Sequence, residues 1–437
     1  TDPPAPRPGQ ARGVARPGDD GPSPWLVLPR TLLALPRLAF RTVTQPLVGV
    51  AELEDRYRVS YRVADLLFND ARTFGIFPIA LIDPPLRSNV GARLIHRDLL
   101  GRREHLSMSG SYGGKHEQTY DAEVDSGVRI PGGLLVLKAA HELRDRNRFY
   151  GLGNAELVEA TDVSGLVDAR DPDVAVAARF RSNTARVKLS AHAPLGGRWA
   201  MQAHQQVRRR ELTSGQVSGG GGPWVSEVFD PDTLRGADTT LHDLHTQLSL
   251  SWDSRQASRR DMPRVLPDSG QRVDAWAGAQ AVMDSPRGVF GRFGLDLQQF
   301  VNLYRGDRVL RLRLRAVAVA GPLEEIPFTD MPALGGARLL RGYRTDRFRG
   351  RFTTLATAEY RYPIQERIAG YLFVDAGRAH ADVDDLSLSD PRIGYGMGIA
   401  TYTLKFALLR LQLATSIDGG FAFHLRLNVT DEPRISY

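Results

Sequence analysis

The sequence feature that most constrains the fold is an alternation of apolar and polar residues that recurs between about residues 73 and 430. In the clearest example, residues 421–429, every second side chain is apolar and those between are small or polar. Because neighbouring side chains on a strand point to opposite faces, this pattern predicts a strand with one apolar and one polar face. The same alternation occurs in residues 184–193, 244–252 and 310–318, so it indicates an all-β chain.

Two kinds of fold accommodate such strands. A soluble antiparallel sheet turns its apolar face inward, whereas a membrane barrel turns that face toward lipid and encloses a polar lumen. The segments here are numerous and about ten residues long, and their apolar faces mix Ala and Leu with aromatic residues rather than dense Ile and Val. The connections also alternate between short and long. These features favour a transmembrane β-barrel over residues 73–430.

Sixteen strands are expected, an even number that suits a closed antiparallel barrel. Their expected positions are residues 73–82, 88–97, 103–113, 117–129, 133–144, 183–193, 197–211, 241–254, 270–284, 288–303, 307–321, 350–363, 367–376, 392–401, 405–415 and 420–430. Tight turns then fall at one end of the barrel and long segments at the other. The long segments are residues 145–182, 211–240, 322–349 and 377–391, and a basic loop at 254–269 is the exception on the short-turn end.

Composition excludes several other classes of protein. No window of about 18 apolar residues exists, so a membrane-spanning helix is not expected. The chain has no cysteine, which rules out disulfides and thiolate metal sites. All but four of its 57 basic residues are arginines, but without a basic helix or aromatic stacking motif they do not indicate a nucleic-acid partner. The closest histidines, His242 and His245, fall on opposite faces of a strand, and no G-x-S-x-G motif occurs. We therefore expect no metal, no cofactor and no enzyme activity.

The residues before the alternation are of a different kind. Residues 1–24 are rich in Pro, Gly, Arg and Asp without periodicity and are expected to form a disordered tail. Residues 25–72 predict two short amphipathic helices in the periplasm, either packed beneath the barrel or associated with the membrane interface or pore. The sequence begins at Thr1 without an apolar signal segment, as expected of an outer-membrane protein after signal-peptide cleavage. Residues 431–437 form the C-terminal end.

Four short motifs occur in a fixed order along the predicted barrel. They are the segment 148–154 (RFYGLGN), the tetrapeptide 340–343 (LRGY), Glu359 in the segment 358–363 (AEYRYP) and the segment 373–377 (FVDAG). With these motifs, roughly residues 73–430 resemble the BamA/TamA superfamily, also called the bacterial surface antigen family. The resemblance implies that the loop 322–349, which carries the tetrapeptide, folds back into the barrel lumen.

The polar residues of these motifs are expected to meet inside the barrel. A carboxylate that faced lipid would cost several kcal/mol, so Glu359 and Asp375 both face inward on adjacent strands. The guanidinium of Arg341 has a planar donor fork that suits carboxylates, and we expect it to pin the loop to both acids. The predicted structural lock comprises Arg341, Gly342, Tyr343, Glu359, Phe373, Asp375 and Gly377.

The resemblance implies a function in inserting barrels into the outer membrane or in moving proteins or lipids across it. Such activity uses a weak seam between the first and last strands, whose unpaired edges template an incoming strand. Gly and Pro weaken strand pairing, so the seam residues here are expected to be Thr73, Gly75, Pro78, Phe421 and Phe423.

One departure from the family bears on partners. No βααβ pattern of a periplasmic POTRA domain precedes the barrel, so the chain is expected to be a POTRA-less member. Its expected partners are outer-membrane lipid and lipopolysaccharide, and a separate periplasmic protein or lipoprotein bound through residues 25–72. The alternative function is an anion-favouring, porin-like channel. Its basic lumen residues would be Arg311, Arg313, Arg315, Arg186 and Lys188.

Overall fold

A single large antiparallel sheet dominates the computed structural model. The structure describes residues 67–71, 73–83, 87–114, 117–214, 222–256, 266–304, 308–365, 368–382, 387, 389–402 and 407–427. The 16 strands of the sheet are β1 (Phe74–Asp83), β2 (Arg87–His96), β3 (Leu106–Tyr112), β4 (Glu117–Asp125), β5 (Leu134–Phe149), β8 (Ala178–Gly196), β9 (Trp199–Thr213), β10 (Thr240–Asp253), β11 (Gly270–Val282), β12 (Val289–Tyr304), β13 (Arg308–Ala320), β16 (Phe352–Gln365), β17 (Ile368–His380), β18 (Arg392–Tyr402), β19 (Ala407–Ser416) and β20 (Phe421–Leu427). The all-β prediction with 16 antiparallel strands is confirmed.

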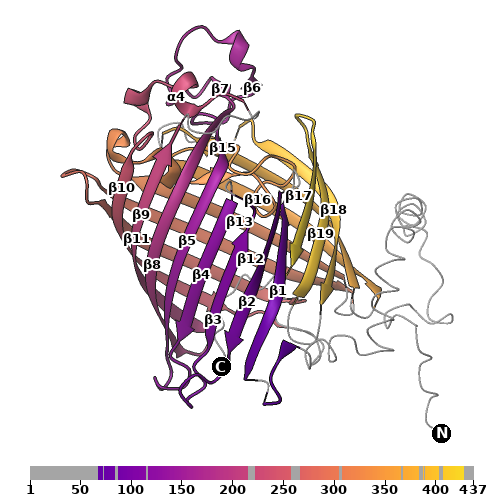
Figure 1. The fold of residues 1–437 in the computed structure, drawn as a ribbon. Coiled ribbons are helices and arrows are strands. Elements are labelled where there is room, and N and C mark those ends of the chain that lie inside the picture. The colour runs from indigo at the N-terminus through magenta and orange to yellow at the C-terminus, as the bar shows by residue number, and fades with distance from the viewer. Residues whose placement is uncertain are drawn as a thin grey trace, which may run out of the picture.

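Each strand pairs with its neighbours in the order of the sequence, from β1 to β20. Figure 1 shows the tilted strands curving around a central space, with the indigo N-terminal strands beside the yellow C-terminal ones. The two end strands, β1 and β20, approach each other, but no pairing register joins them within the described residues. The end strands are therefore the edges of the sheet.

Alternation along β13 places apolar and charged side chains on opposite faces of the wall. Leu312 and Leu314 are 43% and 59% exposed, whereas Arg313 between them faces the interior, where it contacts Asp296 of β12. Phe421 of β20 is 73% exposed on the same outer face. Large apolar side chains in this number on an outer wall fit a lipid environment.

Three strands extend four or more residues beyond their predicted ends. β5 continues to Phe149 and β8 begins at Ala178, so the connection between them is shorter than the predicted 145–182. An irregularity between Arg144 and Asn147 shifts the register of β5 against β8 and breaks the apolar alternation that marks a strand. β17 likewise continues to His380, and its last residues pair with β16. These residues show no apolar alternation, so the sequence did not predict this part of the strand.

The long connections pack together into a cap over one end of the barrel. Figure 1 shows α4 (Val225–Val228), β6 (Leu157–Val158) and β7 (Ala175–Val176) gathered there. Phe149 packs edge to face on Phe229 and Phe328, with ring centroids 5.0 and 4.8 Å apart. These rings belong to one buried apolar cluster that joins three long connections, so the cap has its own core.

The connection between β13 and β16 is the inward loop, residues 321–351. It contains two 3₁₀ turns, Leu323–Glu325 and Phe328–Asp330, and the short pair β14 (Ala333–Leu334) and β15 (Phe348–Arg349). Leu334, Leu340 and Phe348 of the loop pack on Leu355 and Ala379 of the wall. Apolar packing on the wall therefore helps to hold this segment in the inward position that was predicted.

Within the described residues no helix is long and apolar enough to cross a membrane. The predicted tail 1–24, nearly all of the predicted helical segment 25–72 and the end 431–437 lie outside the described residues.

Candidate functional site in the barrel interior

The tip of the inward loop places Arg341 against two carboxylates of the wall. Its backbone N and its Nε donate to Asp375 Oδ2 at 2.9 and 2.7 Å, and its Nη2 donates to Asp375 Oδ1 at 2.8 Å. Its Nη1 donates to Glu359 Oε2 at 2.8 Å. Arg341 is 5% exposed and Asp375 is 1% exposed, so these bonds are shielded from bulk water. The structure thus brings together the three charged residues that the sequence singled out.

Neighbouring residues hold the two acids in place. Thr357 Oγ1 donates to Asp375 Oδ1 at 2.8 Å, and Arg410 Nη2 donates to Glu359 Oε2 at 2.6 Å. The Arg341 guanidinium lies 3.5 Å from the centre of the Phe373 ring, a cation–π contact. Glu359 is therefore shared by two guanidiniums, one from the loop and one from β19.

Close backbone approach explains the glycines around Arg341. Gly342 has φ +101°, and a Cβ there would lie 2.2 Å from the Thr415 carbonyl oxygen. A Cβ on Gly394 of β18 would lie 1.7 Å from the Arg341 carbonyl oxygen. The loop tip can reach the wall only because these two positions carry no side chain.

The remaining residues of the predicted lock lie around this centre. The Tyr343 hydroxyl donates to the Ile393 carbonyl at 3.3 Å, and its ring packs on Phe348 at 5.0 Å. Gly377 of β17 pairs with Leu355 beneath the loop, where a Cβ would lie 3.0 Å from Leu334. Both positions therefore serve the packing of the loop rather than the ionic cluster.

A second ionic cluster holds the start of the inward loop to a different part of the wall. Asp330 accepts from Arg208 Nη2 at 2.7 Å and from Arg210 Nη2 at 2.5 Å, both on β9. Arg292 Nη1 of β12 donates to the Asp330 carbonyl oxygen at 2.7 Å. Asp243 of β10 accepts from Arg208 Nε at 2.9 Å. An acid of the loop thus sits in a socket of wall arginines, the reverse of the charge arrangement at Arg341.

Electrostatics favour the ionised form of Asp330, which is 3% exposed. Burial alone raises the pKa of a carboxyl group, but Arg210 and Arg208 outweigh it and hold the pKa of Asp330 well below its ordinary value. The loop therefore carries a fixed negative charge into the socket at neutral pH.

The two clusters lie on different strands of the sheet. Asp330 contacts β9 and β12, whereas Arg341 contacts β16 and β17 and shares Glu359 with Arg410 of β19. One loop can contact these separate strands only from the space that they surround. The inward loop therefore crosses the interior of the barrel and is fixed at two points with opposite charge.

The cap is tied to the same loop through the predicted 148–154 motif. Gly153 N donates to the Arg349 carbonyl at 2.7 Å, and Arg347 Nη2 donates to the Ala155 carbonyl at 2.7 Å. Arg392 Nη2 of β18 donates to the Asn154 carbonyl at 2.9 Å. The motif thus connects the first long connection to the inward loop, a role that the sequence did not reveal.

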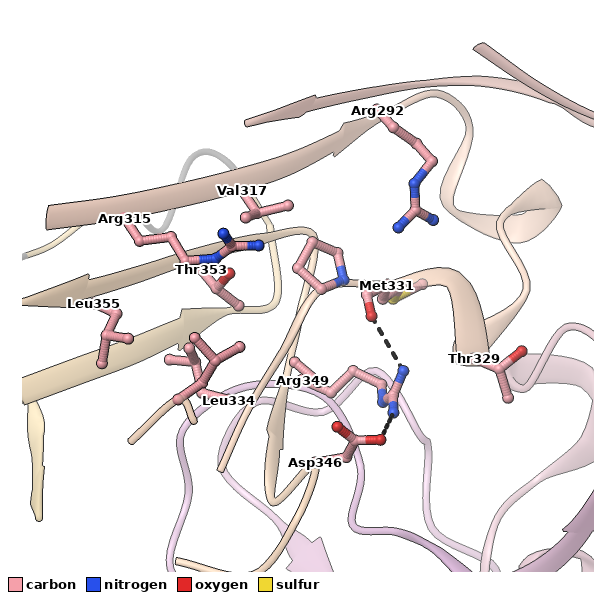
Figure 2. A pocket seen from close by; sticks show the side chains of 13 residues that line it. Arg292, Arg315, Val317, Thr329, Met331, Leu334, Asp346, Arg349, Thr353 and Leu355 are labelled. Atoms are coloured by element: carbon pink, nitrogen blue, oxygen red, sulfur yellow. Dashed lines mark hydrogen bonds and ion pairs between the residues drawn. The ribbon is translucent and has the colours of Figure 1, made fainter. Parts of the chain in front are cut away.

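A small cavity remains between the loop and the wall. Figure 2 shows Arg292 and Arg315 entering it from the wall, and Arg349 bonded to the Met331 carbonyl and to Asp346. Its volume is about 290 Å³. Arg315 also donates to Asp296 at 3.0 Å. The guanidiniums at this cavity are thus paired within the protein.

The predicted basic lumen residues face the interior, but two of them are neutralised. Arg313 Nη2 and Arg315 Nη1 donate to Asp296 Oδ2 at 2.5 and 3.0 Å. Lys188 lies directly across from Lys138 on the lumen face. The expected row of anion-attracting charges is thus interrupted at β13.

The predicted seam residues lie on the two edge strands or next to them. Thr73 precedes β1, and its N–H donates to Asn69 Oδ1 at 2.9 Å. Gly75 and Pro78 lie in β1, and Pro78 pairs with Ala92 of β2. Phe421 and Phe423 are exposed residues of β20. The structure places all five at or next to the two edges of the sheet.

Sequence reasoning missed Arg410, Thr357 and the whole Asp330 socket. Thr357 could have been found, because it shares its strand face with Glu359. The run Arg208–Arg209–Arg210 also carried a usable signal, since parity puts its first and third residues on one face. Within the described residues no cluster of His, Asp or Glu has the arrangement of a metal site.

The chain is similar to known proteins in its structure. No family model matches the chain, and no curated protein matches it. Among solved structures, the chain is similar to BamA from Haemophilus ducreyi lacking POTRA domains 1–3, with a TM-score of 0.54 and 13% identity over 82% of this chain and 69% of that one. The chain has the BamA-type barrel fold.

A second BamA-type barrel gives the same result. CdiB from Escherichia coli has a TM-score of 0.51 and 12% identity, over 81% of this chain and 61% of that one. The chain therefore spans less than two thirds of the length of CdiB. The predicted resemblance to the BamA/TamA superfamily is confirmed at the level of the fold, which at these identities is what the likeness concerns.

Proposed function

We propose that this chain is an outer-membrane barrel that inserts or translocates proteins through a lateral seam between β1 and β20. The exposed apolar faces of its strands would contact lipid, and the charged faces would enclose the inward loop. The interpretation as an outer-membrane protein follows from the BamA-type fold together with this outer apolar surface.

One observation carries the proposal: the inward loop is fixed to the wall, while the described residues of the two edge strands are not paired with each other. Arg341 bonds to both Glu359 and Asp375, whereas the described residues of β1 and β20 share no register. A buried ion pair adds little stability in comparison with apolar packing, but it can fix one specific conformation, here the docked position of the loop. The loop would keep the wall rigid on the β16–β19 side, so that opening is confined to the seam.

An open edge can bind an incoming strand through its free backbone donors and acceptors. β1 contains Gly75 and Pro78, which weaken its own pairing. A client strand would therefore replace weak contacts at the edge rather than break a full ladder.

The alternative function, an anion channel, has less support. The inward loop crosses the interior, and the long connections form a packed apolar cap at one end. Two of the five basic residues expected to attract anions are paired with Asp296. Steady anion-selective conductance of the wild-type protein in a planar bilayer would favour the channel.

Cross-linking across the seam tests the proposal. The chain has no native cysteine, so an introduced pair forms a defined disulfide. A panel that combines one cysteine in β1 with one in β20 should lower the rate of insertion of a test barrel into liposomes by at least about tenfold, and reductant should restore it.

The matched control joins β1 to its ordinary neighbour. Ile76 and Leu94 are register partners in β1 and β2, so a disulfide between Ile76→Cys and Leu94→Cys leaves the seam open. Equal insertion rates in both cross-linked proteins would show that the seam does not open during insertion.

A further inference from the structure

The outer wall of β1–β5, β8 and β9 carries an apolar hollow of about 840 Å³. Its side is fixed by register: Arg208 faces the interior, where it binds Asp330, so Val207 and Arg209 on either side of it face outward. Following the cross-strand partners of Val207 gives one continuous outer row. The row consists of Val207, Val187, Ala139, Ala122, Met108, Leu94 and Ile76.

Small residues make the hollow. The outer face of a barrel is convex, so a depression requires a floor of small side chains with larger ones around it. Gly110, Ala122, Ala139 and Ala185 are among the residues that line the hollow, together with the larger Met108. The volume falls within the range of about 300–1,000 Å³ that is usual for ligand sites.

Polar side chains stand at one end of the hollow. Tyr120 stacks on His141 with ring centroids 6.2 Å apart, and His141 Nε2 lies 2.8 Å from Asn183 Oδ1. Arg209 has a side chain that is 50% exposed, with Glu211 at 3.5 Å as an ion-pair partner. A guanidinium on a lipid-facing wall is costly unless it lies at the polar boundary of the bilayer or meets an anion there.

The polar end lies toward the long connections. Arg209 is four residues from the end of β9, which leads into the connection to β10, and Tyr120 is near the start of β4. In an outer membrane with the long connections outside, this end meets the outer leaflet. The leaflet there consists of phosphorylated glycolipid, and guanidiniums bind phosphate with strong, charge-assisted hydrogen bonds.

We propose that the hollow binds lipid A, with acyl chains over the alanine floor and a sugar phosphate at Arg209 and His141. This inference rests on the proposed outer-membrane placement. The hollow begins at Ile76 of the edge strand β1. A bound lipid therefore covers the outer wall next to the seam.

Native mass spectrometry of the full chain in detergent, titrated with lipid A, tests this. Ala139→Phe fills the floor and should weaken lipid A binding by at least about tenfold. Arg209→Gln should weaken it by roughly fivefold to tenfold, and should do so much less for lipid A from which the phosphates have been removed. Ala356→Phe is the matched control, because Ala356 is an exposed outer-face residue of β16 on another part of the wall.

Heat-modifiable migration on a gel shows which variants fold. If Ala139→Phe does not fold, Ala122→Val is used in its place. Equal binding of lipid A and phosphatidylglycerol, or unchanged lipid A binding in the filled variants, overturns the inference. So does photo-cross-linking of a client strand into the hollow of the membrane-embedded protein in place of lipid. If a filled variant binds lipid A normally while the seam still inserts barrels, this inference fails and the proposed function stands. Failure of the wild-type protein to insert into membranes overturns both.

Discussion

The Arg341→Ala variant is expected to release the tip of the inward loop and to cost roughly 3–5 kcal/mol of loop-docking free energy. The reason is that three side-chain hydrogen bonds, two to Asp375 and one to Glu359, lose their donor while the Asp375 carboxylate stays buried. Only the backbone donor remains in the variant, and it depends on the loop being docked. Limited trypsin digestion of the membrane-embedded protein measures the effect, because the undocked loop exposes several arginines.

Asp375 should matter more than Glu359 for the docking of the loop. Asp375 accepts three of the four bonds, whereas Glu359 keeps Arg410 as a second partner when Arg341 is removed. Asp375→Asn should therefore resemble Arg341→Ala in loop exposure. Arg341→Lys should recover little, since an ammonium group cannot reproduce the planar fork.

Arg338→Ala is the matched control for this experiment. Arg338 is an exposed arginine of the same loop, three residues before Arg341. Its replacement should leave digestion at the remaining loop sites unchanged. If Arg341→Ala digests at the same rate as Arg338→Ala, the lock does not hold the loop.

The Asp330→Asn variant should free the other end of the loop. The substitution removes the charge that Arg208, Arg210 and Arg292 surround, and leaves three guanidiniums with one remaining acid, Asp243. The expected cost is roughly 3 kcal/mol. Because the interior gains positive charge as the loop loosens, planar-bilayer conductance should rise and become anion-selective.

The pH dependence of this contribution follows from the pKa of Asp330, which is lower in the folded protein than in the unfolded chain. A group with a depressed folded pKa stabilises the protein fully above its unfolded pKa of about 4, and the contribution is lost as the pH falls further. The wild-type loop should thus loosen below about pH 4, and Asp330→Asn should remove that part of the acid sensitivity.

Glu324→Gln provides the control for charge. Glu324 is an exposed acid on the same loop, so its loss changes the net charge equally without touching the socket. Conductance like that of the wild type is expected. A rise in conductance in Glu324→Gln equal to that in Asp330→Asn would mean that net charge, rather than the socket, controls the lumen.

The sequence predicted the barrel well because each strand of a membrane wall has one apolar and one polar face, and this appears in the sequence as an alternation. Leu312 and Leu314 face out, and Arg311 and Arg313 face in, so period two gives both the strand and its sides. The prediction was wrong at the ends of β5, β8 and β17, where the residues pair in the sheet but do not show the apolar alternation of the rest of the wall. There, nothing in the composition distinguishes a strand from a loop.

The site was predictable in part for a similar reason. Glu359 and Asp375 lie on adjacent strands, so parity alone put them on the same face. Arg410 comes from β19, and its approach to Glu359 depends on how the barrel curves, which parity does not contain. Asp330 was hidden because a loop has no periodicity, and its partners on β9 lie more than a hundred residues away.

Site-directed spin labelling along β13 tests the central claim most directly, namely that one face of the wall meets lipid and the other encloses the charged interior. Single cysteines at positions 311–316, in a chain without native cysteine, would report collision rates with oxygen and with an aqueous nickel reagent. The claim predicts a period of two, with oxygen collisions highest at positions 312, 314 and 316. Aqueous access at these three positions equal to that at positions 311, 313 and 315 would contradict it.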